Sequence, residues 1–196
     1  MAHRGVTSWA VSLGATVLST YALDAFAAAA GAVLVGSGWC AGFGRPGLVA
    51  LLVVSYAAWG LGLRANVRAN WALLTTTGTS TNVLSKAAYD LTMARTTGAR
   101  APRLAAAAGY VGTELAKEVP YYLGAFGAAA LTGTITSDEA LIFLGGANLG
   151  AALYEYGLAR ATRAFVRRRC ATSPHRRPVR RPSTSDSVVP PRFHLL

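Results

Sequence analysis

Four apolar segments dominate the chain as far as residue 158. They cover residues 9–35, 47–63, 104–131 and 140–158. Each is close to the roughly 20 residues that an α-helix needs to cross a hydrocarbon core about 30 Å thick. A soluble bundle would have to wrap four such buried helices in polar ones, and the chain is too short to supply them. The segments therefore predict an all-α fold, an integral membrane helical bundle with about four transmembrane helices.

The composition favours a membrane protein over a soluble one. Charged residues make up 14% of the 196 residues, against 53% for the hydrophobic set, whereas an average soluble domain is about one quarter charged. The formal net charge is +11, but the basic residues gather at the ends of the apolar runs. This composition argues against an ordinary soluble enzyme, and we expect no nucleic-acid partner.

The arginines orient the predicted spans, because cytoplasmic flanks collect Lys and Arg. Basic residues precede the first span, fill the linker after the second and follow the fourth, whereas the two short loops between paired spans hold few. We therefore expect a plasma-membrane protein with both termini cytoplasmic. The arginines expected to contact lipid headgroups are Arg64, Arg68, Arg160, Arg163, Arg167, Arg168 and Arg169.

The first segment has an alternative interpretation. Its basic start, its apolar run and the small residues Ala25 and Ala27 resemble a cleavable signal peptide. Against cleavage, the apolar run continues through Val35, where a mature secreted domain usually turns polar. Cleavage would leave three spans in the same orientation and would remove Asp24.

The linker at residues 64–103 is predicted to be cytoplasmic and partly helical. Its first part continues the second span, and that helix breaks in the threonine-rich run around Gly78. A short amphipathic helix then follows, capped by Ser80 or Thr81, with a solvated Lys86 near its start. Such a helix usually lies on the bilayer surface or packs beneath the spans.

The composition changes after the predicted membrane domain, residues 1–165. Residues 166–196 are rich in Arg, Pro and Ser and cannot bury enough apolar surface to fold. We expect a disordered cytoplasmic tail, in which each charge near the surface is attracted to anionic lipid headgroups by about 1 kcal/mol.

Cysteine and histidine supply no candidate metal site. Cys40 lies in the first outside loop and Cys170 in the tail, so the two cannot pair across the bilayer. Neither cysteine has neighbours at metal-ligand spacing, and the three histidines all lie in the termini. We therefore expect no metal and no cofactor.

Charged residues inside the apolar segments are the candidate functional residues. An ionised side chain near the bilayer centre costs about 2.5–3.5 kcal/mol, so such residues must pair, become neutral, sit near an interface or line a wet interior. Helical spacing places four polar residues of the third segment on one face, beside the helix break at Pro120. The candidate binding or transport residues are Asp24, Glu114, Lys117, Glu118, Tyr121 and Glu155.

Some of these residues have a structural explanation. If residues 104–117 form an interfacial helix and only residues 119–135 span, the charges of the third segment lie among the headgroups. Glu155 is near the cytoplasmic end of the fourth segment, where an ion pair with Arg160 is its favoured role. Asp24 lies near the middle of the first segment and has no such explanation.

Small residues predict close packing of the first and fourth segments. Ala27 and Gly31 are four residues apart on one helix, as are Gly146 and Gly150 on the other, and this spacing lets helix backbones approach closely. Asn148 lies on the other face of its helix, where it can hydrogen-bond to a neighbour.

Two functions fit these observations. The first is a component of a transporter or channel for a cation, a proton or a small polar solute, with a pathway between subunits of a homo-oligomer. The alternative is a non-catalytic assembly or accessory subunit that packs against partner helices and anionic lipid. We do not expect an enzyme, because the spans hold no activated nucleophile or histidine set and a solvated Lys86 activates no serine.

Overall fold

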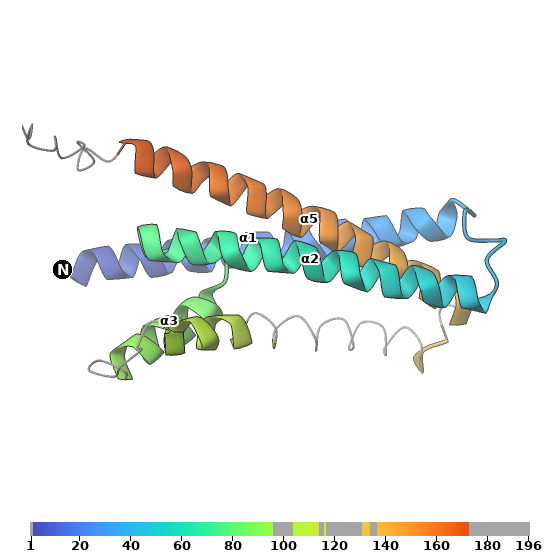
Figure 1. Cartoon of the computed structure of the whole chain (residues 1–196), viewed down its shortest axis with the longest axis horizontal. Coiled ribbons are helices and arrows are strands. Elements are labelled where there is room, and N and C mark those ends of the chain that lie inside the picture. Colours follow the sequence, from blue (N-terminus) through green and yellow to red (C-terminus); the bar gives the residue numbers. More distant parts are fainter. Residues whose placement is uncertain (1, 96–103, 114–115, 117–130, 134–136, 173–196) are drawn as a thin grey trace, which may run out of the picture.

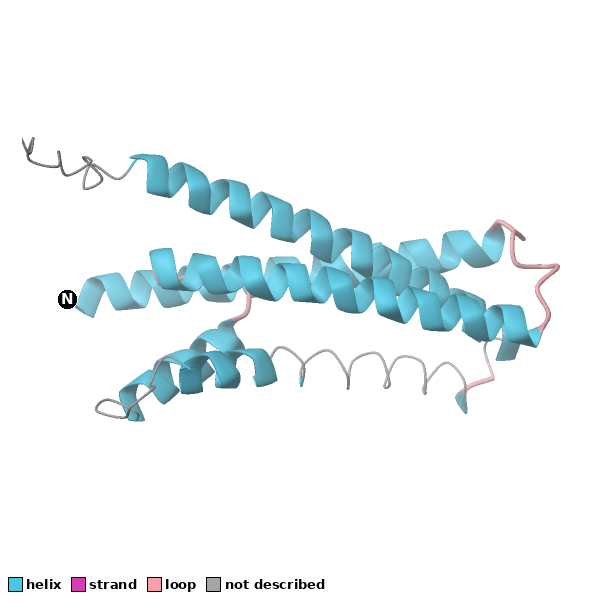
Figure 2. Ribbon diagram, viewed as in Figure 1, coloured by secondary structure: helices cyan, strands magenta, loops and turns pink. Residues whose placement is uncertain are grey.

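The structure is a computed structural model, and it describes residues 2–95, 104–113, 116, 131–133 and 137–172. Within these residues it is all-helical and holds no strand (Figure 1, Figure 2). The helices are α1 (Ala2–Gly36), α2 (Arg45–Thr77), α3 (Val83–Arg95), a short apolar helix at Leu104–Thr113, and α5 (Ser137–Thr172). The all-α fold class is therefore confirmed for the described part of the chain.

Two of the described helices are long and apolar enough to cross a membrane: α1 over Gly5–Gly36, and α2. In the most apolar stretch of each helix, only 17% (α1) and 22% (α2) is buried. Most of the apolar surface of both helices therefore faces outward, unlike that of a core helix in a soluble protein. The predicted span at residues 104–131 lies largely outside the described residues. The predicted span at residues 140–158 forms part of α5, which does not meet the same test of length and hydropathy.

The central helix of the described structure is α5, which packs along both α1 and α2 (Figure 1). α1 and α2 barely touch each other within the described residues, although residues 37–44 join them directly. α5 runs parallel to α2, because Gly145 lies against Leu51 and Gly62 lies against Ala152. A helix covered on two sides by apolar helices needs less apolar surface of its own, which explains why α5 is the more polar of the three.

Glycines on α5 set its close approach to α1. A Cβ atom added at Gly150 would lie 2.5 Å from the Cβ of Ala30, and one added at Gly146 would lie 2.9 Å from the carbonyl oxygen of Ala30. On α1, an added Cβ at Gly31 would lie 2.8 Å from the ring of Phe143. Ala27 is buried in the core cluster beside them. The residues singled out for packing therefore lie where the two backbones are closest.

The end of α2 depends on a glycine. Gly78 has a φ of 73°, in the left-handed region, and its N–H donates to the carbonyl oxygen of Leu74 at 2.8 Å. This is the usual way in which a helix satisfies its last carbonyl groups. α2 accordingly continues past the apolar segment and stops at Thr77, beside the glycine that the sequence indicated as the break.

The start of α3 corrects the sequence prediction. Neither Ser80 nor Thr81 caps this helix, because its cap is Asn82. The Oδ1 atom of Asn82 accepts the N–H of Leu84 at 3.1 Å and the N–H of Ser85 at 3.3 Å, which satisfies two of the free donors at the helix start.

Gly150→Ala is expected to destabilise the bundle. The new methyl group has no space beside Ala30, and forcing extra atoms into a packed contact costs about 1–3 kcal/mol. Gly157 is the matched control, because nothing lies within 4 Å of a Cβ added there on the same helix. Thermal unfolding of the two variants in detergent should show a lower Tm for Gly150→Ala and no loss for Gly157→Ala. Equal Tm values would show that the close approach does not limit stability.

Candidate functional site

Large apolar side chains are widely exposed, and several polar side chains are buried. On α1, the side chains of Val6, Leu18, Tyr21 and Val33 are at least 70% exposed. Soluble proteins rarely leave so much apolar surface uncovered. Among the described residues, the buried polar ones are Ser12, Ser55, Asn66, Asn70, Ser80, Asn82, Ser85, Lys86, Asn148, Glu155 and Thr162. These buried residues identify two places where chemistry is possible, one on α5 and one around the start of α3.

The first place is the face of α5 that meets α2, and its central residue is Asn148. Asn148 is fully buried, and neither its Oδ1 nor its Nδ2 atom has a hydrogen-bond partner. The register of α2 against α5 places Asn148 level with Ser55, which is also fully buried and donates to the carbonyl oxygen of Leu52 at 2.8 Å. Asn148 therefore lies on the face that the sequence predicted, but without the expected hydrogen bond to a neighbour.

Glu155 lies two helical turns from Asn148 on the same face of α5. Its side chain is buried, and its Cβ lies 3.3 Å from a Cβ atom added at Gly62 of α2. Arg160 is exposed, and its expected ion pair with Glu155 is not one of the two pairs seen within the described residues, Arg45–Asp138 and Lys86–Asp90. The spacing of five residues turns the two side chains to different sides of the helix.

Asp24 lies at about the same level along the bundle as Glu155, but at the edge of the bundle. It is half-buried, next to the buried Leu23 of α1. Two residues further along, the ring of Phe26 lies 6.4 Å from that of Tyr154, the neighbour of Glu155. The other four predicted candidates, Glu114, Lys117, Glu118 and Tyr121, lie outside the described residues.

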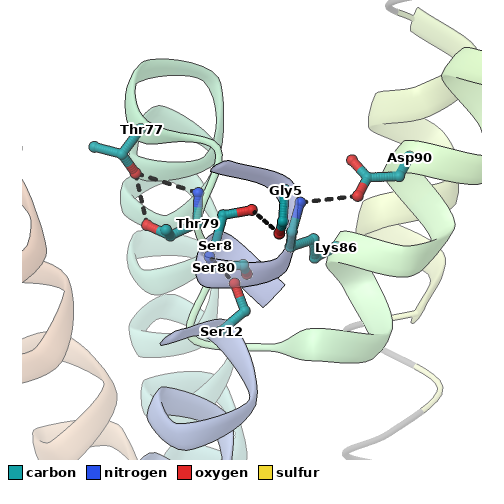
Figure 3. Close-up of polar contacts among 8 residues, drawn as sticks. All are labelled: Gly5, Ser8, Ser12, Thr77, Thr79, Ser80, Lys86 and Asp90. Carbon is teal, nitrogen blue, oxygen red and sulfur yellow. Dashed lines mark hydrogen bonds and ion pairs between the residues drawn. The ribbon is translucent and has the colours of Figure 1, made fainter. Parts of the chain in front are cut away.

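The second place is a network of hydroxyl and amide groups that we call the polar junction. It joins Ser12, Thr16 and Ser19 of α1 and Asn66 and Asn70 of α2 to residues 78–82 and to α3. Ser12 Oγ accepts the N–H of Ser80 at 3.0 Å (Figure 3), and Thr16 Oγ1 accepts the N–H of Val83 at 2.7 Å. These side chains supply acceptors for a loop backbone that has no regular secondary structure.

Two asparagines complete the polar junction on the α2 side. Asn70 donates from Nδ2 to Asn66 Oδ1 at 2.8 Å, and its Oδ1 accepts the hydroxyl of Thr81 at 2.7 Å. Both asparagines are buried. The junction thus ties the loop to α1 and α2 at once, whereas the sequence predicted only a helix break and a helix cap in this region. The polar run from Thr75 to Asn82 was the available signal.

Lys86 is buried at the edge of the polar junction, which corrects its expected exposure to solvent. Its Nζ lies 2.8 Å from Asp90 Oδ2 (Figure 3) and 4.9 Å from the centre of the Trp9 ring. The carboxylate and the ring face both stabilise an ammonium group. α3 therefore turns Lys86 towards α1 and leaves Leu84 and Leu91 exposed, each at 57%.

The arginines expected at the headgroups are exposed throughout. They comprise Arg64 and Arg68 on α2 and the five arginines at residues 160, 163, 167, 168 and 169 on α5.

Within the described residues, no three His, Cys, Asp or Glu side chains lie together as a metal site would require.

No family model, curated protein or solved structure matches the chain.

Lys86→Met is expected to loosen α3 from α1. The substitution keeps an unbranched side chain but removes the charge that contacts Asp90 and Trp9. Amide hydrogens of residues 83–95 should exchange about tenfold faster, since losing a partly buried ion pair and its contact with Trp9 lowers the free energy of local opening. Hydrogen exchange of the full chain in detergent, followed by mass spectrometry, measures this change.

Arg45→Met is the matched control for this experiment. It removes the other described ion pair, whose side chains are 79% and 55% exposed, and exposed pairs contribute little. Exchange in residues 83–95 should stay at its original rate. If the two variants exchange alike there, Lys86 does not hold α3 in place.

Proposed function

We propose that the chain is a multi-pass integral membrane protein of the plasma membrane, with both termini and α3 on the cytoplasmic side. The outward apolar surfaces of α1 and α2 support this location. The loop at residues 37–44 and the exposed Arg45–Asp138 pair then lie at the outer end of the bundle. Arg64 and Arg68 lie near the inner end, as the distribution of basic residues in membrane proteins requires.

Within this membrane unit, we propose a component of a transporter or channel that passes a cation, a proton or a small polar solute. The observation that carries this proposal is the unpaired amide of Asn148 in the centre of the bundle. Leaving such a group without a partner costs about 1–3 kcal/mol. A solute or a water molecule that bound there would supply the missing hydrogen bonds.

The depth of Asn148 agrees with such a role. It lies about 15 Å along α5 from Asp138, at 1.5 Å per residue, which is the middle of a hydrocarbon core about 30 Å thick. The amide offers a donor and an acceptor without charge, and Glu155 lies about 10 Å further towards the cytoplasm. A negative side chain at that position favours protons and cations over anions.

The packing of the bundle indicates where a pathway runs. The side of α5 that meets α1 presents Gly146 and Gly150, which offer no polar side chain to a solute. Asn148 and Glu155 lie on the other side of α5, towards α2 and Gly62. The polar route therefore follows the contact between α5 and α2, and its walls include Ser55.

An accessory role is the second candidate, and Asp24 supports it. Asp24 is half-buried in the apolar α1, beside the outward side chains of Tyr21 and Phe26, which are 72% and 50% exposed. A basic or polar group of a partner helix, or of a second copy of this chain, could pair with it there.

Asn148→Leu and Glu155→Gln are expected to reduce flux in proteoliposomes. Asn148→Leu removes a polar contact for the solute and Glu155→Gln removes the negative charge, and a loss of about 1–3 kcal/mol corresponds to a roughly five- to 150-fold decrease. Proton flux is read from an entrapped pH dye, and sodium or potassium flux from a tracer. Asp138→Asn, at the exposed outer end of the same helix, is the control and should retain the original flux.

Unchanged flux in both variants would contradict the proposed pathway. If the original chain passes none of these ions and instead co-purifies with a stoichiometric membrane partner whose retention needs Asp24, the accessory role is the correct one.

A further inference from the structure

A basic cavity lies on α5 beyond its apolar half. It has a volume of about 350 Å³ and is lined by Tyr156, Arg160, Arg163, Ala164 and Arg167. The tyrosine and the three arginines recur every three or four residues, so they share one face of the helix. All four side chains are exposed at the surface.

The charge of this cavity is uncompensated. Neither ion pair of the described residues involves its arginines. Arg163 donates from Nε to the carbonyl oxygen of Ala159 at 3.1 Å, which holds the side chain along the helix and leaves its terminal N–H groups available. Three like charges around one cavity repel each other, and an anion that binds among them removes this repulsion.

The position of the cavity identifies the source of the anion. The contact of Gly62 with Ala152 and Glu155 sets the register of α2 against α5, and this register places the exposed Arg64 and Arg68 at the depth of Tyr156 and Arg160. Arginine and tyrosine side chains together at one depth are typical of the boundary between the hydrocarbon core and the headgroups.

We propose that this cavity binds the phosphate of an anionic phospholipid headgroup in the cytoplasmic leaflet, a site that rests on the membrane location proposed above. The planar guanidinium groups of Arg160 and Arg163 suit a phosphate, since each can donate two parallel hydrogen bonds to its oxygens. The Tyr156 hydroxyl donates a further bond at the apolar end, where the glycerol joins the headgroup. The acyl chains then extend along the exposed apolar surface of α5, where Leu153 is 68% exposed.

The experiment uses the full chain, purified in a mild detergent, with dioctanoyl phosphatidylglycerol as the probe. Native mass spectrometry measures the Kd. The site variant is Arg160→Gln with Arg163→Gln. The matched control is Arg168→Gln with Arg169→Gln, which removes the same charge from the same helix but outside the cavity. We expect the site variant to raise the Kd about tenfold or more and the control to raise it less than about threefold, as general attraction by lost charges predicts.

Two further measurements complete the test. Dioctanoyl phosphatidylcholine, which carries the same phosphate but no net charge, should bind at least about tenfold more weakly than phosphatidylglycerol to the original chain. Arg160→Lys with Arg163→Lys keeps the charge and loses the planar donors, and its Kd should lie between those of the original chain and the site variant.

The proposal fails if the site and control variants weaken phosphatidylglycerol binding equally, because the attraction then belongs to the whole basic segment. It also fails if inorganic phosphate binds at the cavity and phosphatidylglycerol does not displace it, since the ligand is then a free anion. Extraction of the membranes with alkaline carbonate tests the location separately: release of the chain contradicts the membrane location, whereas retention without headgroup binding contradicts only this site.

Discussion

The packing of α5 between α1 and α2 is the constraint on which the other features of the structure depend. Gly146 and Gly150 present almost no side chain to α1, so the two backbones meet directly. In the membrane location proposed above, many weak dispersion contacts would replace the hydrophobic driving force that helices lack among lipids. On its other side α5 packs against α2, and this second contact buries Asn148 and Glu155.

Much of the helical framework could be predicted from the sequence. The apolar runs and the glycine at residue 78 depend on local chemistry, so the positions of α1 and α2 and the end of α2 follow from nearby residues. The hydropathy of α5 was a poorer guide. Its polar residues look unfavourable for a helix among lipids, and only the packing of α1 and α2 around it explains how it accommodates them.

The candidate sites were less accessible to prediction, because they depend on contacts between distant parts of the chain. Lys86 belongs to a short amphipathic helix, and periodicity alone does not say which of its faces meets the bundle. Trp9 decides this, and it lies far away in the sequence. The polar junction likewise needs Ser12 and Asn70 to meet one loop. The predicted ion pair of Glu155 with Arg160 rested on closeness in sequence, whereas five residues of helix turn the two side chains to different sides.

The order of the helices along the chain differs from their order in space, and this difference constrains how the protein is made. α5 leaves the ribosome after α1 and α2, yet it occupies the place between them. Without α5, the described residues join the two earlier helices through residues 37–44 and through the polar junction near the other end. The newly made hairpin must therefore stay open along its length to admit a late and more polar helix. A premature collapse of α1 onto α2 would compete directly with completion of the bundle.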